Sequence, residues 1–290
     1  MTVGALGLVL AAALLHATWN LVLKQSAGKL TVSWLGVLAG TLLATPGLLL
    51  VPGGLGISPA GWACILATGL LHALYFLFLS EAYERGELSL VYPLARGSGP
   101  LLVALLAPLL LGEVLTPGGA TGIGLVVLGL FGMAGGPEPT GPGQSRLLAQ
   151  WRAPHVTMAL LTGLTIAGYS LVDKVGVGLV HPTLYQILMM GLAFLALAPY
   201  VLWRQRPSLA SVKAEWRAVA LVGVFSFVAY QLVLFALRLA KVAYVVAARE
   251  VSIVFGVALG AAFLGERHGA RHLIAAASIA AGTLLIGLSR

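Results

Sequence analysis

The feature that most constrains this chain is a series of ten apolar segments, each about twenty residues long. An apolar helix of ~20 residues crosses the hydrocarbon core of a bilayer, which is ~30 Å thick. None of the segments alternates polar and apolar residues as the strands of a membrane barrel do. The sequence therefore predicts an all-α membrane protein with ten transmembrane helices, at residues 4–23, 33–51, 60–80, 88–111, 117–135, 155–173, 183–203, 216–237, 244–264 and 271–288.

The scarcity of charge supports this assignment. Only 9% of the residues are charged and 59% are hydrophobic, whereas roughly a quarter of the residues of a soluble domain are charged. The net charge of +8 fits loops that face anionic lipid, and no basic run interleaved with aromatic residues predicts a nucleic-acid partner. The first segment lacks the basic flank and cleavage site of a signal peptide. We expect a multi-pass protein of the cell membrane, which is the inner membrane if the source is a Gram-negative bacterium.

The two halves of the chain repeat each other. Leu111-Gly112-Glu113 recurs as the same three letters at 264–266, and Arg96 recurs at the same spacing as Arg249. The segment WNLVLK at 19–24 is matched by YSLVDK at 169–174. We expect a first five-helix repeat at 1–136, a Pro- and Gly-rich linker at 137–154 and a second five-helix repeat at 155–290. An odd number of spans in each repeat gives the two repeats opposite orientations, which is the inverted arrangement of many membrane transporters.

These motifs resemble those of the EamA family of the drug/metabolite transporter superfamily. The resemblance covers essentially the whole chain and rests on the Leu-Gly-Glu ends of both fourth helices, on YERGELSLVYPLARGSG at 83–99 and on HATWN at 16–20. It implies a secondary active transporter that works by alternating access, as an exporter or an exchanger of amino acids or other small metabolites. Relatives also carry nucleotide sugars or phosphorylated sugars, which are the alternative substrate class.

Polar residues within the apolar segments are candidates for the substrate site, because polar groups in the bilayer are costly and therefore often functional. Two arginines occupy equivalent positions of the repeats, and a buried guanidinium binds a carboxylate or phosphate with two parallel hydrogen bonds. We therefore expect a substrate with a carboxylate or phosphate, and an amino acid in the first place. The expected substrate-binding residues are Trp19, Asn20, Tyr92, Arg96, Tyr169, Tyr230, Gln231, Arg249 and Ser252.

A second set of polar residues predicts proton coupling. His16 and His72 are expected at the same depth in the membrane as Arg96, and histidine titrates near neutral pH. Glu250 is a carboxylate beside the second arginine and is also the expected partial counter-ion of the two guanidinium groups. The predicted proton-coupling residues are His16, His72 and Glu250. The expected partners are a small-molecule substrate, membrane lipid and either a proton or a counter-substrate, with the chain acting as a monomer or homodimer.

Structural interpretations of the same residues stay open at this point. The arginines could pair within the protein, and the histidines, Asn20 and Gln231 could form hydrogen bonds between helices. Glu113 precedes Thr116-Pro117, where a carboxylate suits the N-terminus of the next helix. A membrane-embedded enzyme and a channel or lipid scramblase are the alternative functions. Scattered histidines and the lack of a metal-ligand cluster, a nucleophile motif or a phosphate-binding loop predict no enzyme, no metal and no cofactor.

The basic residues of the loops predict an orientation. The face reached after the first helix carries most of them, and the positive-inside rule places that face in the cytoplasm and both termini outside. Related transporters often have both termini in the cytoplasm, so the two arguments disagree. The basic residues assigned to the first face are Lys24, Lys29, Arg85, Arg146, Arg152, Arg204, Arg206, Lys213, Arg217, Arg267 and Arg271, and those assigned to the other are Lys174, Arg238, Lys241 and Arg290.

Overall fold

The fold of this computed structural model is helical throughout the part of the chain that it describes, which is residues 1–51, 56–85, 88–133, 154–264 and 269–289. Within these ranges, nine helical stretches are long and apolar enough to cross a membrane, and a tenth apolar helix at Pro117–Met133 is shorter. The prediction of a multi-pass helical membrane protein is thereby confirmed. Residues 137–153 of the predicted linker at 137–154 lie outside the described part of the chain.

The helices fall into two sets, one on each side of the undescribed residues 134–153. The first set is α1 (Val3–Gln25), α2 (Lys29–Ala44) with the 3₁₀ helix η1 (Thr45–Leu50), α3 (Pro59–Arg85), α4 (Leu88–Leu111) and α5 (Pro117–Met133). The second set is α7 (Pro154–Leu179), α8 (Pro182–Arg204), α9 (Leu209–Ala214), α10 (Trp216–Leu239), α11 (Val242–Arg249), α12 (Ser252–Leu264) and α13 (Ala270–Leu288).

Two helix boundaries differ from the predicted spans for local reasons. The span predicted at 33–51 changes into the 3₁₀ helix η1 after Ala44. Pro46 has no N–H for the α-helical hydrogen-bond ladder, which accounts for the change. The short helix α9 was not predicted, and it begins with a capping box between Ser208 and Ser211.

The span predicted at 244–264 corresponds to an apolar stretch from Val242 to Phe263, but this stretch consists of two helices, a break that was not predicted. The N–H groups of Glu250 and Val251 donate to carbonyl groups three residues earlier, at 3.1 and 3.2 Å, instead of four residues earlier. The tighter turn ends α11 at Arg249, within a span that runs from Val242 to Phe263. Membrane proteins often use an interrupted helix of this kind to build a site within the bilayer.

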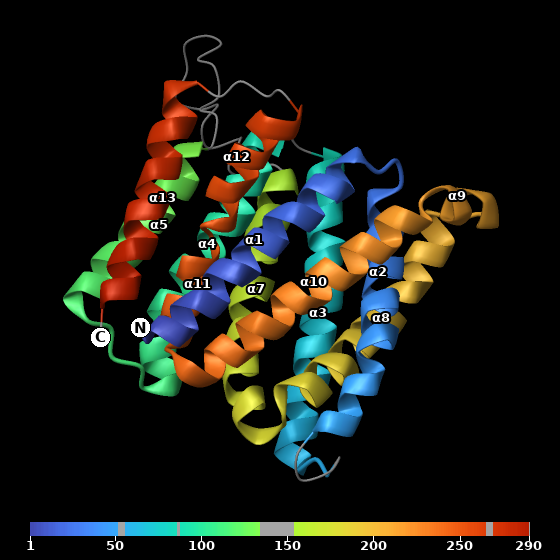
Figure 1. Ribbon diagram of the computed structural model, residues 1–290, viewed down its shortest axis with the longest axis horizontal. Helices are drawn as coiled ribbons and strands as arrows, with labels where there is room; N and C mark the ends of the chain where they lie inside the picture. The colour runs from blue at the N-terminus through green and yellow to red at the C-terminus, as the bar shows by residue number, and fades with distance from the viewer. Residues whose placement is uncertain (52–55, 86–87, 134–153, 265–268, 290) are drawn as a thin grey trace.

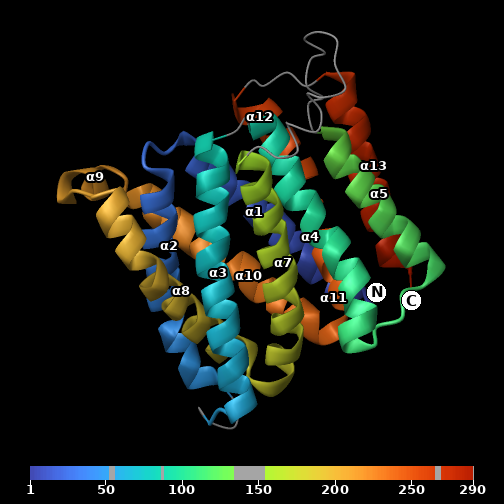
Figure 2. The same cartoon turned by 180° about the vertical axis from the view of Figure 1, so that it is seen from behind.

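The two halves of the chain interlock. The most extensive contacts each pair a helix from before residue 134 with one from after residue 153: α5 with α13, α3 and α4 with α7, and α1 and α2 with α10. Figures 1 and 2 show that α1 starts at the end of the bundle where both termini lie, whereas α7 starts at the opposite end. The first helices of the two halves therefore run in opposite directions, as inverted repeats require.

Glycines allow a close approach between α2 and α10, which belong to different halves. A Cβ atom on Gly40 of α2 would lie 2.6 Å from the carbonyl oxygen of Gly223 of α10, and a Cβ on Gly223 would lie 2.7 Å from the carbonyl oxygen of Gly36. Helices in a membrane approach closely where small residues face each other. This contact sets the spacing of α2 and α10 beside the cavity described next.

Candidate functional site

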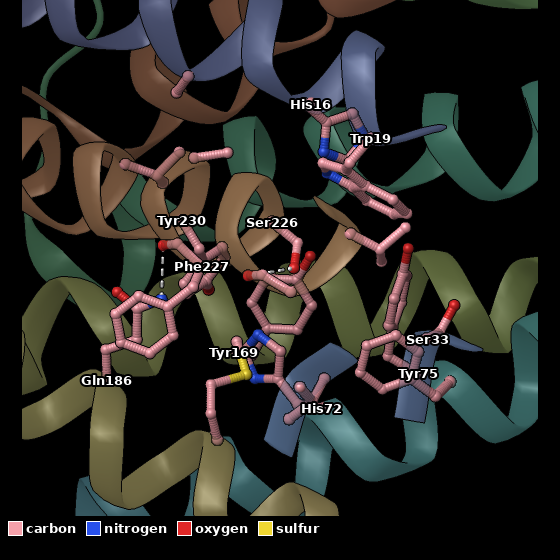
Figure 3. A pocket seen from close by; sticks show the side chains of 18 of the residues that line it. His16, Trp19, Ser33, His72, Tyr75, Tyr169, Gln186, Ser226, Phe227 and Tyr230 are labelled. Carbon is pink, nitrogen blue, oxygen red and sulfur yellow. Dashed lines mark hydrogen bonds between the residues drawn. The ribbon is translucent and has the colours of Figure 1, made fainter. Parts of the chain in front are cut away.

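A cavity lies between the two halves of the bundle. About 850 Å³ of empty space lies within it, its open side included. Figure 3 shows side chains from α1, α2, α3, α7, α8 and α10 around it. Arg96 of α4 and Arg249 of α11 also line it. Both halves of the chain therefore build the site, as the inverted repeat predicts.

Aromatic rings form much of the cavity wall. The ring of His72 stacks on Tyr169 with 4.1 Å between centroids, and it meets the edge of Tyr230 at 5.2 Å. His16 and Trp19 form a separate edge-to-face pair with centroids 4.9 Å apart. In Figure 3 this pair lies apart from the His72 cluster. The wall thus combines broad apolar surfaces with a few polar tips, which is the usual lining of a small-molecule site.

Arg96 and Glu250 form a buried ion pair between α4 and the turn that separates α11 from α12. Arg96 Nε donates to Glu250 Oε2 at 3.0 Å, and Arg96 Nη2 lies 2.9 Å from the same oxygen. The two side chains are only 5% and 1% exposed. Such a pair compensates each charge inside the protein. Glu250, the expected partial counter-ion of the two arginines, is thus bonded to Arg96.

Arg249 differs from Arg96, its equivalent in the repeat. It is the last residue of α11, lines the cavity and is 5% exposed. Its Nε and Nη2 atoms are buried and have no hydrogen-bond partner among the described residues. Burying two guanidinium nitrogens without hydrogen-bond partners carries a desolvation cost. The cavity therefore favours an anionic group beside Arg249.

Three other residues that line the cavity also have buried polar atoms without a hydrogen-bond partner among the described residues. These atoms are Trp19 Nε1, His72 Nε2 and Gln186 Oε1. The indole N–H is a donor and the amide oxygen is an acceptor. His72 Nδ1 lies 2.8 Å from the carbonyl oxygen of Thr68, so Nδ1 carries the proton and Nε2 of the neutral ring is an acceptor. The cavity wall thus offers both unused donors and unused acceptors.

A carboxylate that was not among the expected site residues lies behind the aromatic cluster. Asp173 of α7 is fully buried, and three hydroxyl groups donate to it. Thr68 Oγ1 and Tyr185 OH donate to Oδ1 at 2.6 and 2.9 Å, and Tyr230 OH donates to Oδ2. Since Tyr230 lines the cavity, this carboxylate is connected to the site by one hydrogen bond.

Gln186 is the second residue of the site that was not expected there. Its Nε2 donates to the carbonyl oxygen of Phe227 at 2.8 Å and so joins α8 to α10, while its oxygen has no partner among the described residues. Figure 3 shows the two side chains next to Tyr230. A glutamine within an apolar segment is the sequence signal that could have placed it in the site.

Polar contacts between the halves hold the start of α11. Glu113 Oε1 accepts a hydrogen bond from the backbone N–H of Val242 at 2.9 Å, so the carboxylate serves the N-terminus of α11 and not that of α5 as expected. Lys174 Nζ lies 3.9 Å from the same oxygen and donates to the carbonyl groups of Leu237 and Ala240 at the end of α10. These contacts fix the helix that carries Arg249.

The cavity brings together seven of the twelve expected site residues, namely His16, Trp19, His72, Arg96, Tyr169, Tyr230 and Arg249. Asn20 instead donates to the carbonyl oxygen of His16, one turn earlier on α1. Gln231, Glu250 and Ser252 do not line the cavity. The side chain of Tyr92 lies outside the described part of the structure. The roles assigned to all twelve residues stay predictions.

The fold and the cavity together define a multi-pass membrane protein with a cavity between two interlocked halves. The model of the EamA-like transporter family matches residues 3–135 and 154–288, so the chain belongs to this family. The resemblance inferred from the motifs is confirmed. One solved crystal structure is similar to this chain with a TM-score of 0.77 and 19% sequence identity, over 99% of this chain and 98% of that one. At this identity the likeness shows the fold alone. No curated protein matches the chain in sequence.

Proposed function

We propose that the protein is a secondary active transporter with ten membrane spans. It exports or exchanges an amino acid across the cell membrane by alternating access. The observation that carries this proposal is the set of unpaired polar atoms in the cavity wall. Arg249 and Trp19 offer donors that suit a carboxylate, and His72 and Gln186 offer acceptors that suit an ammonium group. A zwitterionic amino acid supplies both partners in one small molecule.

The charge of the site favours a carboxylate over a phosphate. Arg96 is compensated by Glu250, so among the described residues of the cavity wall Arg249 is the arginine without an ion pair. One guanidinium matches the single charge of a carboxylate in a bidentate pair. A phosphate monoester carries up to two negative charges and would leave part of its charge without a partner in an apolar cavity.

Alternating access requires that the two halves move relative to each other around the bound substrate. In this protein both halves contribute to the cavity wall, and α11 holds Arg249 next to an interruption of the helix. The contacts of Glu113 and Lys174 join α4, α7 and α10–α11 at one end of the bundle. We expect these contacts to form and break as the ends of the bundle open in turn.

Binding to the purified protein tests the substrate class. The thermal unfolding temperature is measured with L-phenylalanine, L-leucine and L-threonine, and with analogues of phenylalanine that lack one group, phenethylamine and 3-phenylpropionate. We expect at least one amino acid to raise the unfolding temperature, and the two single-group analogues of phenylalanine to have less effect than phenylalanine itself if it is the ligand. A shift with glucose 6-phosphate and with no amino acid would favour the phosphorylated alternative.

Transport by the reconstituted protein tests the mechanism. Proteoliposomes loaded with the unlabelled amino acid identified by binding should take up the labelled form faster than empty ones, and uptake should saturate. Such counterflow needs a carrier that returns loaded through the membrane. Uptake that is linear with concentration and unaffected by internal substrate would instead indicate a channel.

A further inference from the structure

Asp173 is an unusual carboxylate for a membrane interior, because all its hydrogen bonds among the described residues come from hydroxyl groups. Its donors come from three helices: Thr68 on α3, Tyr185 on α8 and Tyr230 on α10. Within the described residues no lysine, arginine or histidine forms an ion pair with it. The neighbouring Lys174 turns away and donates to carbonyl groups at the end of α10. Asp173 thus differs from Glu250, which has Arg96.

An ionised carboxylate without a counter-charge is costly in this environment, even with good hydrogen bonds. Hydroxyl groups, however, can serve both protonation states of the acid. Each can donate to the carboxylate, and each can also turn and accept a hydrogen bond from the protonated acid. The three hydroxyl groups therefore form a shell that fits Asp173 with and without a proton, which arginine or lysine would not do.

The shell leads to the cavity along two routes. Tyr230 lines the cavity and donates directly to Asp173 Oδ2. His72 also lines the cavity, and its Nδ1 lies 2.8 Å from the carbonyl oxygen and 3.2 Å from the hydroxyl oxygen of Thr68. A change of charge on Asp173 thus alters the hydrogen bonding of Tyr230 and His72, which both line the cavity.

The titratable groups around Asp173 come from several helices. Cys64 and His72 face it from α3, Tyr185 from α8 and Tyr230 from α10. Helices α4 and α11 also pack against α7. Their arginines, Arg96 and Arg249, line the cavity and, within the described residues, do not form an ion pair with Asp173.

We propose that Asp173 binds and releases the proton that drives transport, and that Tyr230 couples the protonation of Asp173 to substrate binding. This inference rests on the transport function proposed above. A proton from cavity water binds Oδ2 and forms an O–H bond, which donates to the Tyr230 oxygen. The Tyr230 hydroxyl then turns and donates to the anionic group of the substrate. The proton later leaves to water, which restores the carboxylate. Proton and substrate anion therefore favour each other's binding.

Infrared difference spectroscopy tests the proton site without any substrate. The reconstituted protein is compared between neutral and acidic pH, and the carboxylic-acid C=O band of a buried acid is followed. We expect this band in the wild type and in Tyr185→Phe and Tyr230→Phe, with its frequency shifted by loss of a hydrogen bond, and its absence in Asp173→Asn. An unchanged band in Asp173→Asn, or no shift in either tyrosine variant, would overturn the proposal.

Binding of the amino acid identified above tests the link to the substrate. In the wild type, affinity should rise severalfold from neutral to acidic pH, and in Asp173→Asn it should not change with pH. Tyr230→Phe should lose this dependence, whereas Tyr185→Phe should keep it, because Tyr185 donates to the same carboxylate but does not line the cavity. Equal pH dependence in Tyr230→Phe and the wild type would overturn the role of Tyr230.

The two experiments separate this inference from the proposed substrate. An infrared band that disappears in Asp173→Asn supports the proton site even if no amino acid binds, in which case only the substrate class is wrong. If an amino acid binds but the infrared band does not depend on Asp173, the proposed substrate class is supported and the proposed proton site is wrong.

Discussion

Arg96 donates from Nε to Glu250 Oε2 at 3.0 Å, although the two residues belong to opposite halves of the chain. This buried pair ties α4 to the turn that ends α11, and it leaves Arg249 as the arginine of the cavity wall without an ion pair among the described residues. Two positions that the repeat makes equivalent in sequence therefore have different surroundings. One arginine belongs to the interior of the protein, and the other is available to a substrate.

The ion pair predicts that Arg96 matters for folding. Arg96→Ala leaves Glu250 buried without a counter-charge, so we expect it to lower the free energy of unfolding by ~3–5 kcal/mol. The double variant Arg96→Met with Glu250→Gln removes both charges and should recover much of this loss. Thermal unfolding of the purified variants measures the difference. A double variant no more stable than Arg96→Ala would show that the pair is not the cause.

The environment of Tyr185 predicts a second effect on stability. A Cβ atom on Gly176 would lie 2.4–2.5 Å from ring and hydroxyl atoms of Tyr185, which is fully buried and bonded to Asp173. Gly176→Ala should therefore destabilise the protein by ~1–3 kcal/mol through overpacking. Gly178→Ala, two residues further along the same helix, meets nothing within 4 Å and is the matched control. Equal unfolding temperatures for the two variants would contradict the packing argument.

The histidines of the cavity give a third prediction. His16 and His72 both line the cavity, but only His72 is linked to Asp173 through Thr68. If the coupling proton is carried by a histidine, as the sequence predicts, and not by Asp173, the change of that histidine to Gln should abolish uptake driven by a pH gradient and leave counterflow intact. Both modes are measured in proteoliposomes with the amino acid identified by binding. Loss of both modes together would indicate a structural or binding role instead.

The orientation in the membrane is a fourth prediction, derived from the basic residues of the loops. A cysteine placed at Gln144, in a background where Cys64 is changed to Ser, should not react with a membrane-impermeant thiol reagent added to intact cells. It should react after the cells are opened. Labelling of intact cells would place this segment outside and both termini in the cytoplasm.

Much of the fold could be predicted because apolar length alone defines the membrane spans. The position of the helix break could not. The segment 242–253 contains neither Gly nor Pro, and yet the helix is interrupted at Glu250 and Val251. The equivalent part of α4 contains Gly97, Gly99 and Pro100 but stays one helix. Tertiary contacts, such as the hydrogen bond from Arg96 to Glu250, lie at the break, and they are not visible in local sequence.

The site could be predicted in part for a similar reason. Charged and aromatic residues in apolar helices pointed to Arg96, Arg249 and His72, because such residues are rare in the membrane. Asp173 was not among the predicted site residues, and its equivalent in the first repeat is Leu23, so the comparison of the halves does not mark this position. The hydroxyl groups that surround it come from three helices, and only the folded chain brings them together.

The measurement that tests the account most directly is amino-acid binding to Arg249→Lys, with Arg238→Lys as a matched control outside the cavity. Lysine keeps the charge and loses the bidentate fork. We expect Arg249→Lys to weaken binding by ~1–3 kcal/mol, roughly the scale of a charged hydrogen bond, while Arg238→Lys binds like the wild type. If Arg249→Lys folds and binds as tightly as the wild type, Arg249 does not hold the substrate and the central claim is wrong.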